Sequence, residues 1–280
     1  MHDKRDQVTG NRGQEETLPP VTCNLSPHYT LKELMTIVAA REIKDGDIVF
    51  CGTGISMLAA MAAKNINAPN SVIFFETGAI DSLLEEVPLA VADSRVMYWT
   101  SVNGNLADAF ATMQNRISGP HVVGIMGAAQ IDKFGNLNST VVGDYFRPRV
   151  RFSGSGGACD VASFVGRTIT FMQHEKRKFV PKLDYITSPG WLDGPDARRK
   201  AGLPDGGPES VITNMATMGF DSITREMYLS GYFPGFTPQQ IQDNMGFEID
   251  TSRAVEVAPP TEFELKILRE KCDPHRLILG

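Results

Sequence analysis

The hydrophobic positions of this chain form short continuous runs separated by stretches with helical spacing. The continuous runs are rich in β-branched and aromatic residues and cover residues 48–51, 71–75, 122–126 and 168–172. Such runs are typical of strands that are buried on both faces of a sheet. Between them apolar residues recur at helical spacing, as over residues 31–39. Strands that alternate with helices predict an α/β fold with an open, mostly parallel sheet and helices on both faces.

The first regular element is expected to begin at Thr30, because Thr30 and Glu33 have the types and spacing of a capping box. Residues 1–29 are polar and rich in Gly, Pro, Asp and Glu. This composition is typical of a flexible arm, or of a segment that orders only against a partner. A length of 280 residues suits one large α/β domain, or two small ones. We therefore predict an arm over residues 1–29 and a single domain over residues 30–280.

Glycine and proline mark two further features. Gly52-Thr53-Gly54 follows the first apolar run and predicts a tight turn into a helix. It does not match a dinucleotide fingerprint, because the third glycine would fall at position 57, which is Met. Residues 187–209 contain four Pro and five Gly. This composition predicts a long irregular loop.

Composition and charge narrow the class of protein. The net charge is −6, so there is no basic footprint for nucleic acid, and anionic substrates would need local basic groups. The four cysteines form no Cys-x-x-Cys pair, which argues against a zinc site or a disulfide framework and favours a reducing compartment. The amino terminus lacks the apolar core of a signal peptide, and no apolar run approaches the roughly 18 residues that span a bilayer. These features predict a cytoplasmic protein without a membrane span or a bound metal.

Glu76 is the first candidate for chemistry. It ends the apolar run 71–75 and precedes Thr77-Gly78, where the chain is expected to turn. A carboxylate at the tip of a buried strand is costly unless it is paired or chemically used. In open α/β sheets that edge is also where ligands bind. Two interpretations stay open: Glu76 caps the following turn, or it acts as a nucleophile.

A glycine-rich segment, residues 153–160, is the second candidate. Its glycines allow the backbone N–H groups of Gly156 and Gly157 to approach a ligand closely. Such N–H groups can bind a phosphate or stabilise a developing oxyanion. The alternative is a flexible surface turn, whereas a phosphate-binding P-loop is excluded because no Gly-Lys-Ser/Thr follows. Together with Glu76, the segment favours acyl transfer through an anhydride.

Several polar residues are candidates for substrate binding. Arg147, Arg149 and Arg151 alternate along an extended segment, so we expect them to face one side and to bind a substrate carboxylate. Gln130 and Asn138 follow the run 122–126. For these two amides both interpretations stay open: they line the thioester or substrate pocket, or they hold the loop together.

Three other features are interpreted as structural. Residues 174–178 begin like a zinc-protease motif, but position 178 is Lys and not a second His, so no zinc site is expected. Their charges suit a solvated hairpin or a subunit contact, with binding of a CoA phosphate as the sharper alternative. Asp132 and Asn136 are expected to hold a loop through Asx turns. Cys159 is expected to be a small buried residue.

Taken together, these segments resemble the beta subunits of family I CoA-transferases of the glutaconate type. Glu76-Thr77-Gly78 is similar to the Glu-Ser-Gly segment that carries the family's catalytic glutamate, with Thr in place of Ser. Residues 127–132 and 135–140 are similar to its Gly-Gly-Ala-Gln-Ile-Asp and Gly-Asn-Val-Asn-Ser-Thr segments. The resemblance runs from about residue 31 to about residue 274. Further counterparts, in the same order, are Gly143-Asp144-Tyr145, residues 154–157, residues 172–177 and residues 188–191.

The resemblance implies a reaction and a partner. It implies ping-pong transfer of CoA between an acyl-CoA and a carboxylic acid, with a dicarboxylic acid such as glutaconate as one candidate, through a glutamyl-CoA thioester on Glu76. Coenzyme A would be a substrate, and neither a cofactor nor a metal is implied. The family works with a separate A (alpha) subunit of comparable size. Alternatives on the same fold are a hydrolase of CoA thioesters, a ring-cleaving hydrolase, or a non-catalytic subunit.

Overall fold

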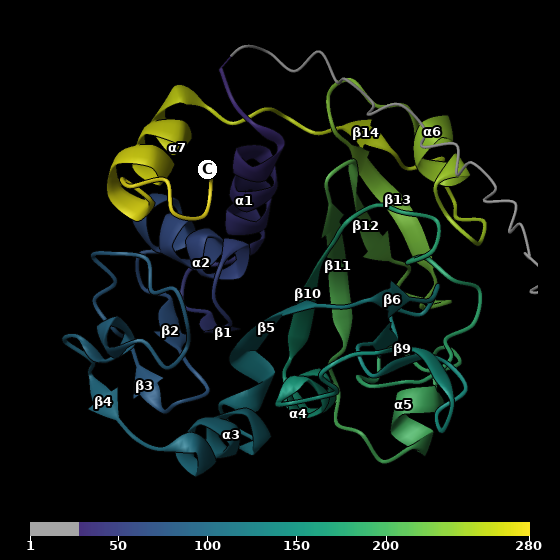
Figure 1. Cartoon of the computed structure of the whole chain (residues 1–280), viewed down its shortest axis with the longest axis horizontal. Coiled ribbons are helices and arrows are strands. Elements are labelled where there is room, and N and C mark those ends of the chain that lie inside the picture. The colour runs from purple at the N-terminus through teal and green to yellow at the C-terminus, as the bar shows by residue number, and fades with distance from the viewer. Residues whose placement is uncertain (1–27) are drawn as a thin grey trace, which may run out of the picture.

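A ten-stranded open sheet runs through residues 28–280, the part of the chain that the computed structural model describes (Figure 1). Its five central strands, from β11 to β2, run parallel to one another, and both flanks add antiparallel strands. The mostly parallel sheet predicted from the sequence is therefore confirmed. In spatial order the strands are β14 (Val255–Glu256), β13 (Met227–Tyr232), β12 (Ala216–Phe220), β11 (Pro208–Thr213), β10 (Arg167–Met172), β5 (Val122–Gly127), β1 (Ile48–Cys51), β2 (Val72–Phe74), β3 (Ala79–Ile80) and β4 (Val102–Asn103).

Helices cover both faces of this sheet. Successive residues of a strand point to opposite faces, and β1 shows the consequence. Val49 lies in a buried cluster with Met57 of α2, whereas Phe50 lies in a second cluster with Met113 of α3 and Val161 of α4. The helices are α1 (Leu31–Glu42), α2 (Ile55–Ile66), α3 (Leu106–Gln114), α4 (Ala158–Phe164), α5 (Ala197–Lys200), α6 (Pro238–Asp243) and α7 (Glu262–Lys266), with a π-helical turn over Ile267–Cys272 and 3₁₀ turns over Ser94–Met97 and Gly119–His121.

The first helix, α1, lies close to α7 (Figure 1). Two ion pairs join α1 to α7 and to the π-helical turn that follows it. Glu33, the third residue of α1, accepts hydrogen bonds from Arg269 at 2.7 and 3.0 Å. Glu264, the third residue of α7, accepts from Arg41 in the last turn of α1 at 2.8 and 2.7 Å. Both glutamates also complete capping boxes, so the box predicted at Thr30 is confirmed. Each carboxylate thus caps its own helix and binds an arginine of the other segment.

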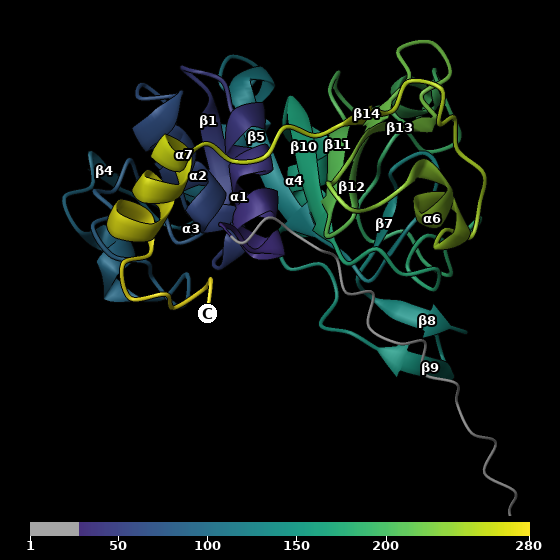
Figure 2. The same ribbon diagram turned by 90° about the horizontal axis from the view of Figure 1, so that it is seen from above.

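Two small hairpins lie outside the main sheet. One pairs β6 (Gln130–Ile131) with β7 (Leu137–Asn138), and the other pairs β8 (Val141–Gly143) with β9 (Pro148–Arg151). Figure 2 shows that the β8–β9 hairpin stands away from the rest of the fold. At its tip the Phe146 side chain is 87% exposed. An exposed aromatic ring on a projecting hairpin is typical of a surface that contacts another molecule.

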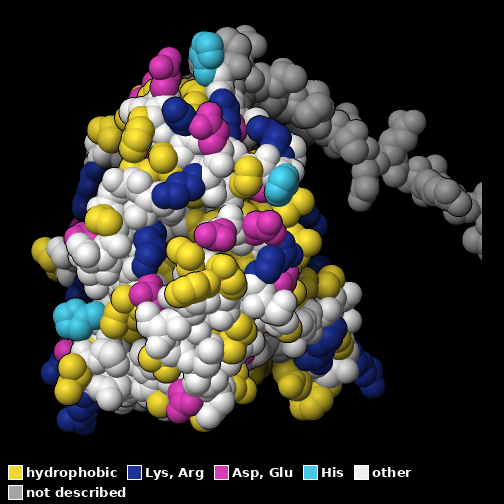
Figure 3. Space-filling view, turned by 90° about the vertical axis from the view of Figure 1, so that its left-hand side faces the viewer, with side chains coloured by type: hydrophobic (Ala, Val, Ile, Leu, Met, Phe, Trp, Pro, Cys, Tyr) yellow, Lys and Arg dark blue, Asp and Glu magenta, His cyan; other side chains and the backbone are white. Residues whose placement is uncertain are grey.

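A second group of exposed apolar side chains surrounds β3 and β4. It includes Trp99, which is 75% exposed, together with Tyr98, Val102 and Leu106. The space-filling view of the side of the molecule that carries β3, β4 and α7 shows hydrophobic side chains among acidic and basic ones (Figure 3). This surface is therefore mixed in character and is not a field of one charge sign.

Four other expectations concern the loop at residues 187–209, the turn at Gly54, the amino-terminal arm and membrane-spanning helices. The loop predicted for residues 187–209 contains the short helix α5 and leads into β11, and strands β11–β13 were not predicted. Gly54 is the N-cap of α2 and has φ +82°, a backbone conformation that favours glycine, in agreement with the predicted tight turn into the helix. Up to residue 27, the arm predicted for residues 1–29 lies outside the described residues. Within residues 28–280, every helix is too short or too polar to cross a membrane.

Candidate active site

Glu76 lies in a turn that the backbone closes by itself. The N–H of Gly78 donates to Phe75 O at 3.0 Å, and the N–H of Phe75 donates to Ala79 O at 3.0 Å. The half-buried Glu76 carboxylate has no hydrogen bond or ion pair to any residue between 28 and 280. It does not cap the turn, so the structure gives no support to the interpretation of Glu76 as a capping residue.

The start of α3 holds this turn in place. Gly78 has φ +96°, and a Cβ built on it would lie 2.5 Å from Asn105 N. The N–H of Gly104 donates to Gly78 O at 2.8 Å. Asn105 is the N-cap of α3 and forms a capping box with Asp108. This contact was not predicted from the sequence, although the Asn-x-x-Asp spacing marks the start of a helix.

The glycine-rich segment lies directly beside Glu76. A Cβ built on Gly157 would stand 3.3 Å from Glu76 Oε1 and 2.6 Å from Phe110 Cζ of α3. The structure therefore brings together two residues that the sequence pattern links only by their chemistry. Phe110 was not predicted to be part of the site, and no local pattern distinguishes it from other apolar residues of α3.

Two N–H groups of this segment remain available for a ligand. The N–H of Ala158 donates to Ser155 O, and that of Cys159 to Ser155 Oγ, both at 3.0 Å. The N–H groups of Gly156 and Gly157 have no acceptor within residues 28–280. Gly156 has φ +49°, a conformation that favours glycine. These are the two donors that the sequence predicts for an oxyanion.

The glycine-rich segment is tied to the β6–β7 hairpin. The N–H of Gly154 donates to Ser139 O at 3.1 Å, and Ser139 Oγ donates to Gly154 O at 3.0 Å. These reciprocal bonds anchor the segment on the residue that follows β7. A freely flexible surface turn, the alternative left open by the sequence, does not fit this anchoring.

Asn138 orients Gln130 within this hairpin. Asn138 is fully buried, and its Oδ1 accepts from the N–H groups of Thr140 and Val141 at 3.0 and 3.2 Å. Its Nδ2 donates to Gln130 Oε1 at 2.7 Å and to Val141 O at 2.6 Å. Both donors and both acceptor positions of Asn138 are thus in use. Asn138 holds the loop, and only Gln130 has a free group, its NH₂.

Asp132 and Asn136 hold a loop, in agreement with the Asx-turn interpretation. Asp132 Oδ1 accepts from the N–H groups of Phe134 and Asn136 at 2.9 and 3.0 Å. Asn136 Oδ1 accepts from the N–H groups of Gly190 and Leu192. Burial raises the pKa of Asp132, although its hydrogen bonds to Asn136 act in the opposite direction. Both side chains are therefore used by the fold.

The three predicted arginines have different surroundings. Arg149 lines a cavity of about 690 Å³ together with Gln130. Arg151 lies over the Tyr145 ring at 4.7 Å and donates to Tyr145 O. Arg147 is exposed in the turn of the hairpin. A bulge in the β8–β9 pairing interrupts the simple alternation on which the expectation of one common side was based.

His174 and Cys159 have well-defined environments. His174 is buried; its Nε2 lies 3.0 Å from Ile241 O, and burial lowers its pKa to about 4. The expectation that Cys159 is buried is wrong: the residue is exposed, because α4 turns Val161 and Ala162 toward the sheet instead. In the described part of the chain, His, Cys, Asp and Glu form no group of three or more that could hold a metal ion.

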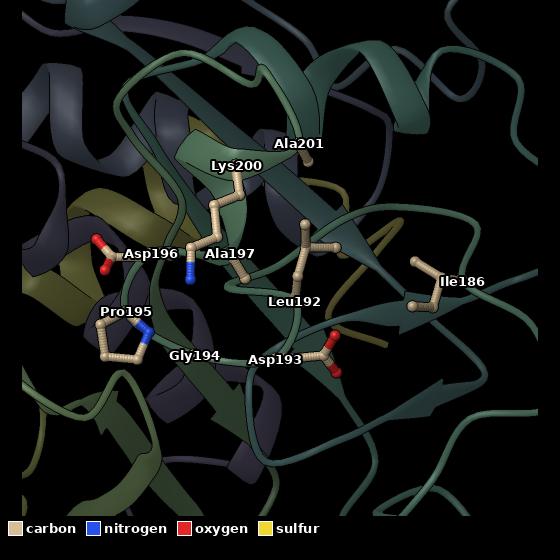
Figure 4. Close-up of a pocket in the computed structure, with 9 residues that line it drawn as sticks. All are labelled: Ile186, Leu192, Asp193, Gly194, Pro195, Asp196, Ala197, Lys200 and Ala201. Carbon is tan, nitrogen blue, oxygen red and sulfur yellow. The ribbon is translucent and has the colours of Figure 1, made fainter.

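A second cavity, of about 660 Å³, lies in the loop region around α5 (Figure 4). The carboxylates of Asp193 and Asp196 lie on different sides of it, and Asp196 pairs with Arg199 at 2.8 Å. None of the site residues predicted from the sequence lines this cavity. The candidate chemistry therefore remains at Glu76 and the glycine-rich segment.

Comparison with known proteins defines the family. Residues 32–244 match the family described as coenzyme A transferase. This match covers most of the chain, and the chain belongs to the coenzyme A transferase family.

Individual proteins with similar sequences are also subunits of CoA-transferases. The chain is 42% identical to the B subunit of glutaconate CoA-transferase from Acidaminococcus fermentans, over 88% of this chain and 94% of that protein. It is 36% identical to the B subunit of 3-oxoadipate CoA-transferase from Pseudomonas knackmussii, over 86% of this chain and 92% of that protein. The crystal structure of glutaconate CoA-transferase from A. fermentans superposes with a TM-score of 0.87 at 40% identity, covering 90% of this chain and 98% of that chain. The chain is thus similar to the B subunits of CoA-transferases.

Proposed function

We propose that this chain is the catalytic subunit of a heteromeric CoA-transferase that works through a glutamyl-CoA thioester on Glu76. The observation that carries the proposal is the position of the Glu76 carboxylate. It has no partner among the described residues, and it lies beside Gly157, whose N–H is also free. An unpaired carboxylate next to free N–H donors suits a nucleophile whose attack generates an oxyanion.

The proposed reaction has four steps. Glu76 attacks the thioester carbonyl of an acyl-CoA, and the CoA thiolate leaves from the tetrahedral intermediate as a mixed anhydride forms. The thiolate then attacks the Glu76 carbonyl of the anhydride and releases the first acid as a carboxylate. The acceptor carboxylate attacks the resulting glutamyl-CoA thioester, so that a new anhydride and the free thiolate form. The thiolate finally attacks the acyl carbonyl, which yields the new acyl-CoA and free Glu76.

The neighbouring groups have separate roles in this scheme. The N–H groups of Gly156 and Gly157 donate to the tetrahedral oxyanion, where loss of one donor typically costs about 10²–10³ in rate. Gln130 offers its free NH₂ to the substrate, and Asn138 fixes its orientation. Arg149, on the wall of the same cavity, supplies positive charge for an anionic substrate.

A second subunit completes the proposed enzyme. Both relatives described above are B subunits. The exposed apolar side chains around Trp99 and at the β8–β9 tip give this chain surfaces on which an A subunit can dock. The chain should therefore purify with a separately encoded A subunit of similar size. Full transferase activity in a homo-oligomer of this chain would contradict this part of the proposal.

The acid substrate is a carboxylic acid, and a dicarboxylic acid of the glutaconate type is the first candidate. The similarity to the B subunit of glutaconate CoA-transferase from A. fermentans supports this choice. A hydrolase of CoA thioesters is the second candidate function, since a water molecule could replace the acceptor acid at the glutamyl intermediate. Dependence of CoA release on an acceptor acid separates the two activities.

The test of the proposal traps the intermediate. The assembled complex is incubated with acyl-CoA in the absence of an acceptor acid and is then reduced with borohydride. We expect the Glu76 thioester to become an alcohol, detected by mass spectrometry of a peptide spanning residues 71–80, with parallel loss of activity. A complex that exchanges CoA while its Glu76 remains unmodified would overturn the mechanism.

A further inference from the structure

The Phe110 ring of α3 lies where the glycine-rich segment and Glu76 meet. Apart from the residues bonded to Gly157, three atoms are nearest to the place that a Cβ on Gly157 would take. Two are carbons of the Phe110 ring, Cζ at 2.6 Å and Cε1 at 3.0 Å, and the third is Glu76 Oε1 at 3.3 Å. The ring edge and the carboxylate therefore adjoin the same side of Gly157. The absence of a side chain at Gly157 is what lets the ring approach.

Two contacts of α3 fix the position of this ring. Just before α3 begins, the N–H of Gly104 donates to Gly78 O at 2.8 Å, in the turn that carries Glu76. Further along, α3 contacts α4, whose N-cap is Gly157 (Figure 1). The segment around α3 thus joins the two parts of the candidate site, and the same backbone that supports the turn of Glu76 also positions the Phe110 ring.

Phe110 does not belong to the main buried stripe of α3. Ala109 and Met113, four residues apart on one face of the helix, are almost fully buried in the core cluster. Phe110 lies about 100° further round the helix than Ala109. It is only partly buried and packs at the edge of the same cluster. Phe110 therefore connects the core with the site and does not serve the core alone.

The ring edge affects what can reach the Glu76 carboxyl group. The carboxylate has no hydrogen-bond or ion-pair partner among residues 28–280, and its neighbour on this side is apolar. Once Glu76 carries CoA as a thioester, its carbonyl carbon can be attacked by an acceptor carboxylate or by water. Next to an apolar ring an attacking water loses hydrogen-bond partners, which is costly. The carbons of an acceptor acid can instead pack against the ring, which is favourable.

We infer that Phe110 selects transfer over hydrolysis at the Glu76 thioester, because its ring keeps water from one side of the thioester carbonyl. This role rests on the proposed transferase function and concerns the step after the thioester has formed. In the suppressed reaction the oxygen of water bonds to the Glu76 carbonyl carbon and the C–S bond breaks. The thiolate takes one proton of the water and leaves as CoA, the other proton is released, and the Glu76 carboxylate is regenerated.

The experiment measures the lifetime of the thioester in the assembled complex. The complex is loaded with glutaryl-CoA, separated from unbound thioester and free acid by gel filtration, and incubated without an acceptor. Borohydride is added at successive times, and mass spectrometry of the peptide spanning residues 71–80 gives the fraction of Glu76 converted to the alcohol. A parallel incubation in water labelled with heavy oxygen identifies hydrolysis, because the oxygen that water adds remains on Glu76.

Phe110→Ala removes the ring, and Phe110→Leu keeps part of the apolar wall. We expect the thioester of Phe110→Ala to decay about tenfold faster than that of wild type, with heavy oxygen entering Glu76. Phe110→Leu should show a smaller acceleration. In steady state with glutarate as acceptor, the ratio of hydrolysis to transfer should rise in the same order.

Phe164→Ala is the matched control for the Phe110 variants. Phe164 is also a partly buried phenylalanine at the edge of the same core cluster, but it lies at the opposite end of α4 from Gly157. Its replacement should leave the lifetime of the thioester unchanged. An equally fast decay in Phe164→Ala would contradict the inference, since any loosening of the core would then admit water.

The outcomes separate failure of this role from failure of the transferase mechanism. Thioesters that form and decay equally fast in wild type and in both Phe110 variants would overturn the role of Phe110 alone. Loss of thioester formation in both variants would also overturn it, because the ring would then be needed for the first step. Absence of a thioester in the wild-type complex would overturn the mechanism, and the role of Phe110 with it.

Discussion

Glu76 Oε1 lies 3.3 Å from the point where a Cβ on Gly157 would stand. The two residues come from different elements, the turn after β2 and the start of α4, and Phe110 of α3 packs against the same glycine. Gly157 has an ordinary φ of −79°, so its small size matters here for space and not for backbone conformation. The Gly157 N–H and the Glu76 carboxylate have no partner among residues 28–280, as the proposed mechanism requires of an oxyanion donor and a nucleophile.

Gly157→Ala should therefore damage activity more than stability. The added methyl group would lie 2.6 Å from Phe110 Cζ, so either the ring or the glycine segment must move. We expect CoA exchange to fall about 10²-fold, since misplacement by about 1 Å has that effect. The stability cost should be about 1–3 kcal/mol, as for other overpacked sites.

Gly154→Ala is the matched control for Gly157→Ala. Gly154 has φ +93° and open space around its Cα, so alanine there should cost about 1 kcal/mol of backbone strain and leave exchange nearly intact. Exchange assays and urea unfolding of both variants make the comparison. Equal loss of exchange in the two variants would contradict a special role for the Gly157–Glu76 contact.

Glu76→Gln should abolish exchange without destabilising the protein. The Glu76 carboxylate has no partner among residues 28–280, so its removal breaks no bond and should change the free energy of unfolding by less than about 0.5 kcal/mol. Glu76→Asp withdraws the nucleophile by one methylene and should lose about 10²-fold in rate. Thermal unfolding and exchange assays on the assembled complexes measure both effects. Residual exchange near wild-type level in Glu76→Gln would exclude Glu76 as the nucleophile.

Arg269→Met should destabilise the contact between α1 and the C-terminal segment. Glu33 is fully buried, and Arg269 donates two hydrogen bonds to it, with Arg276 as a second cation at 4.0 Å. Without Arg269 the Glu33 carboxylate loses its main partner, which should cost about 2–3 kcal/mol of unfolding free energy. Glu33→Gln leaves Arg269 partly exposed to water and should cost less, about 1–2 kcal/mol.

The ion pair between Glu33 and Arg269 should also make the free energy of unfolding fall in acid. Burial raises the pKa of Glu33, but the hydrogen bonds from Arg269 and Thr30 outweigh it and lower the pKa overall. A lowered pKa means that the stabilisation is present above the unfolded value of about 4.3 and is lost as pH falls through the folded value. Urea unfolding from pH 7 to pH 3 should show this loss in wild type and a smaller one in Glu33→Gln. Identical pH profiles would contradict the assignment.

His174 should make the free energy of unfolding depend on pH as well, in a higher pH range than Glu33 does. Its Nε2 lies 3.0 Å from Ile241 O, and its buried Nδ1 has no partner in the described structure. Burial lowers the pKa of His174 to about 4, so the neutral ring is favoured in the folded protein. The stabilisation is present above the unfolded pKa of about 6.5 and declines as pH falls toward the folded value, by up to about 3 kcal/mol.

His174→Gln tests this dependence, because glutamine does not titrate. The variant should be less stable than wild type at pH 7, and its unfolding free energy should fall less between pH 6.5 and pH 5. Urea unfolding across that range measures the slope. A slope equal to that of wild type would show that another group is responsible.

The local sequence pattern predicted those strands and helices that can be recognised without knowing their neighbours in the fold. Runs of β-branched and aromatic residues marked β1, β2, β5 and β10, because strands buried on both faces need continuous apolar sequence. Strand β11 and the two antiparallel strands that follow it, β12 and β13, were missed. Thr217, Gly219 and Gly231 interrupt their apolar pattern, and pairing with neighbouring strands stabilises them instead. Cys159 was misjudged because the face that α4 buries depends on how that helix packs.

The sequence by itself determined that a carboxylate follows a buried apolar run, that a glycine-rich segment allows its N–H groups to approach a ligand, and that both resemble one family pattern. Only the tertiary structure decided that Glu76 meets Gly157, and that Asn138 uses all its hydrogen bonds while Gln130 keeps one group free. The physical reason is how far apart along the chain the interacting residues lie. Spacing and composition report interactions within one helix, strand or turn, whereas these contacts depend on strand order and on how α3 and α4 pack against the sheet.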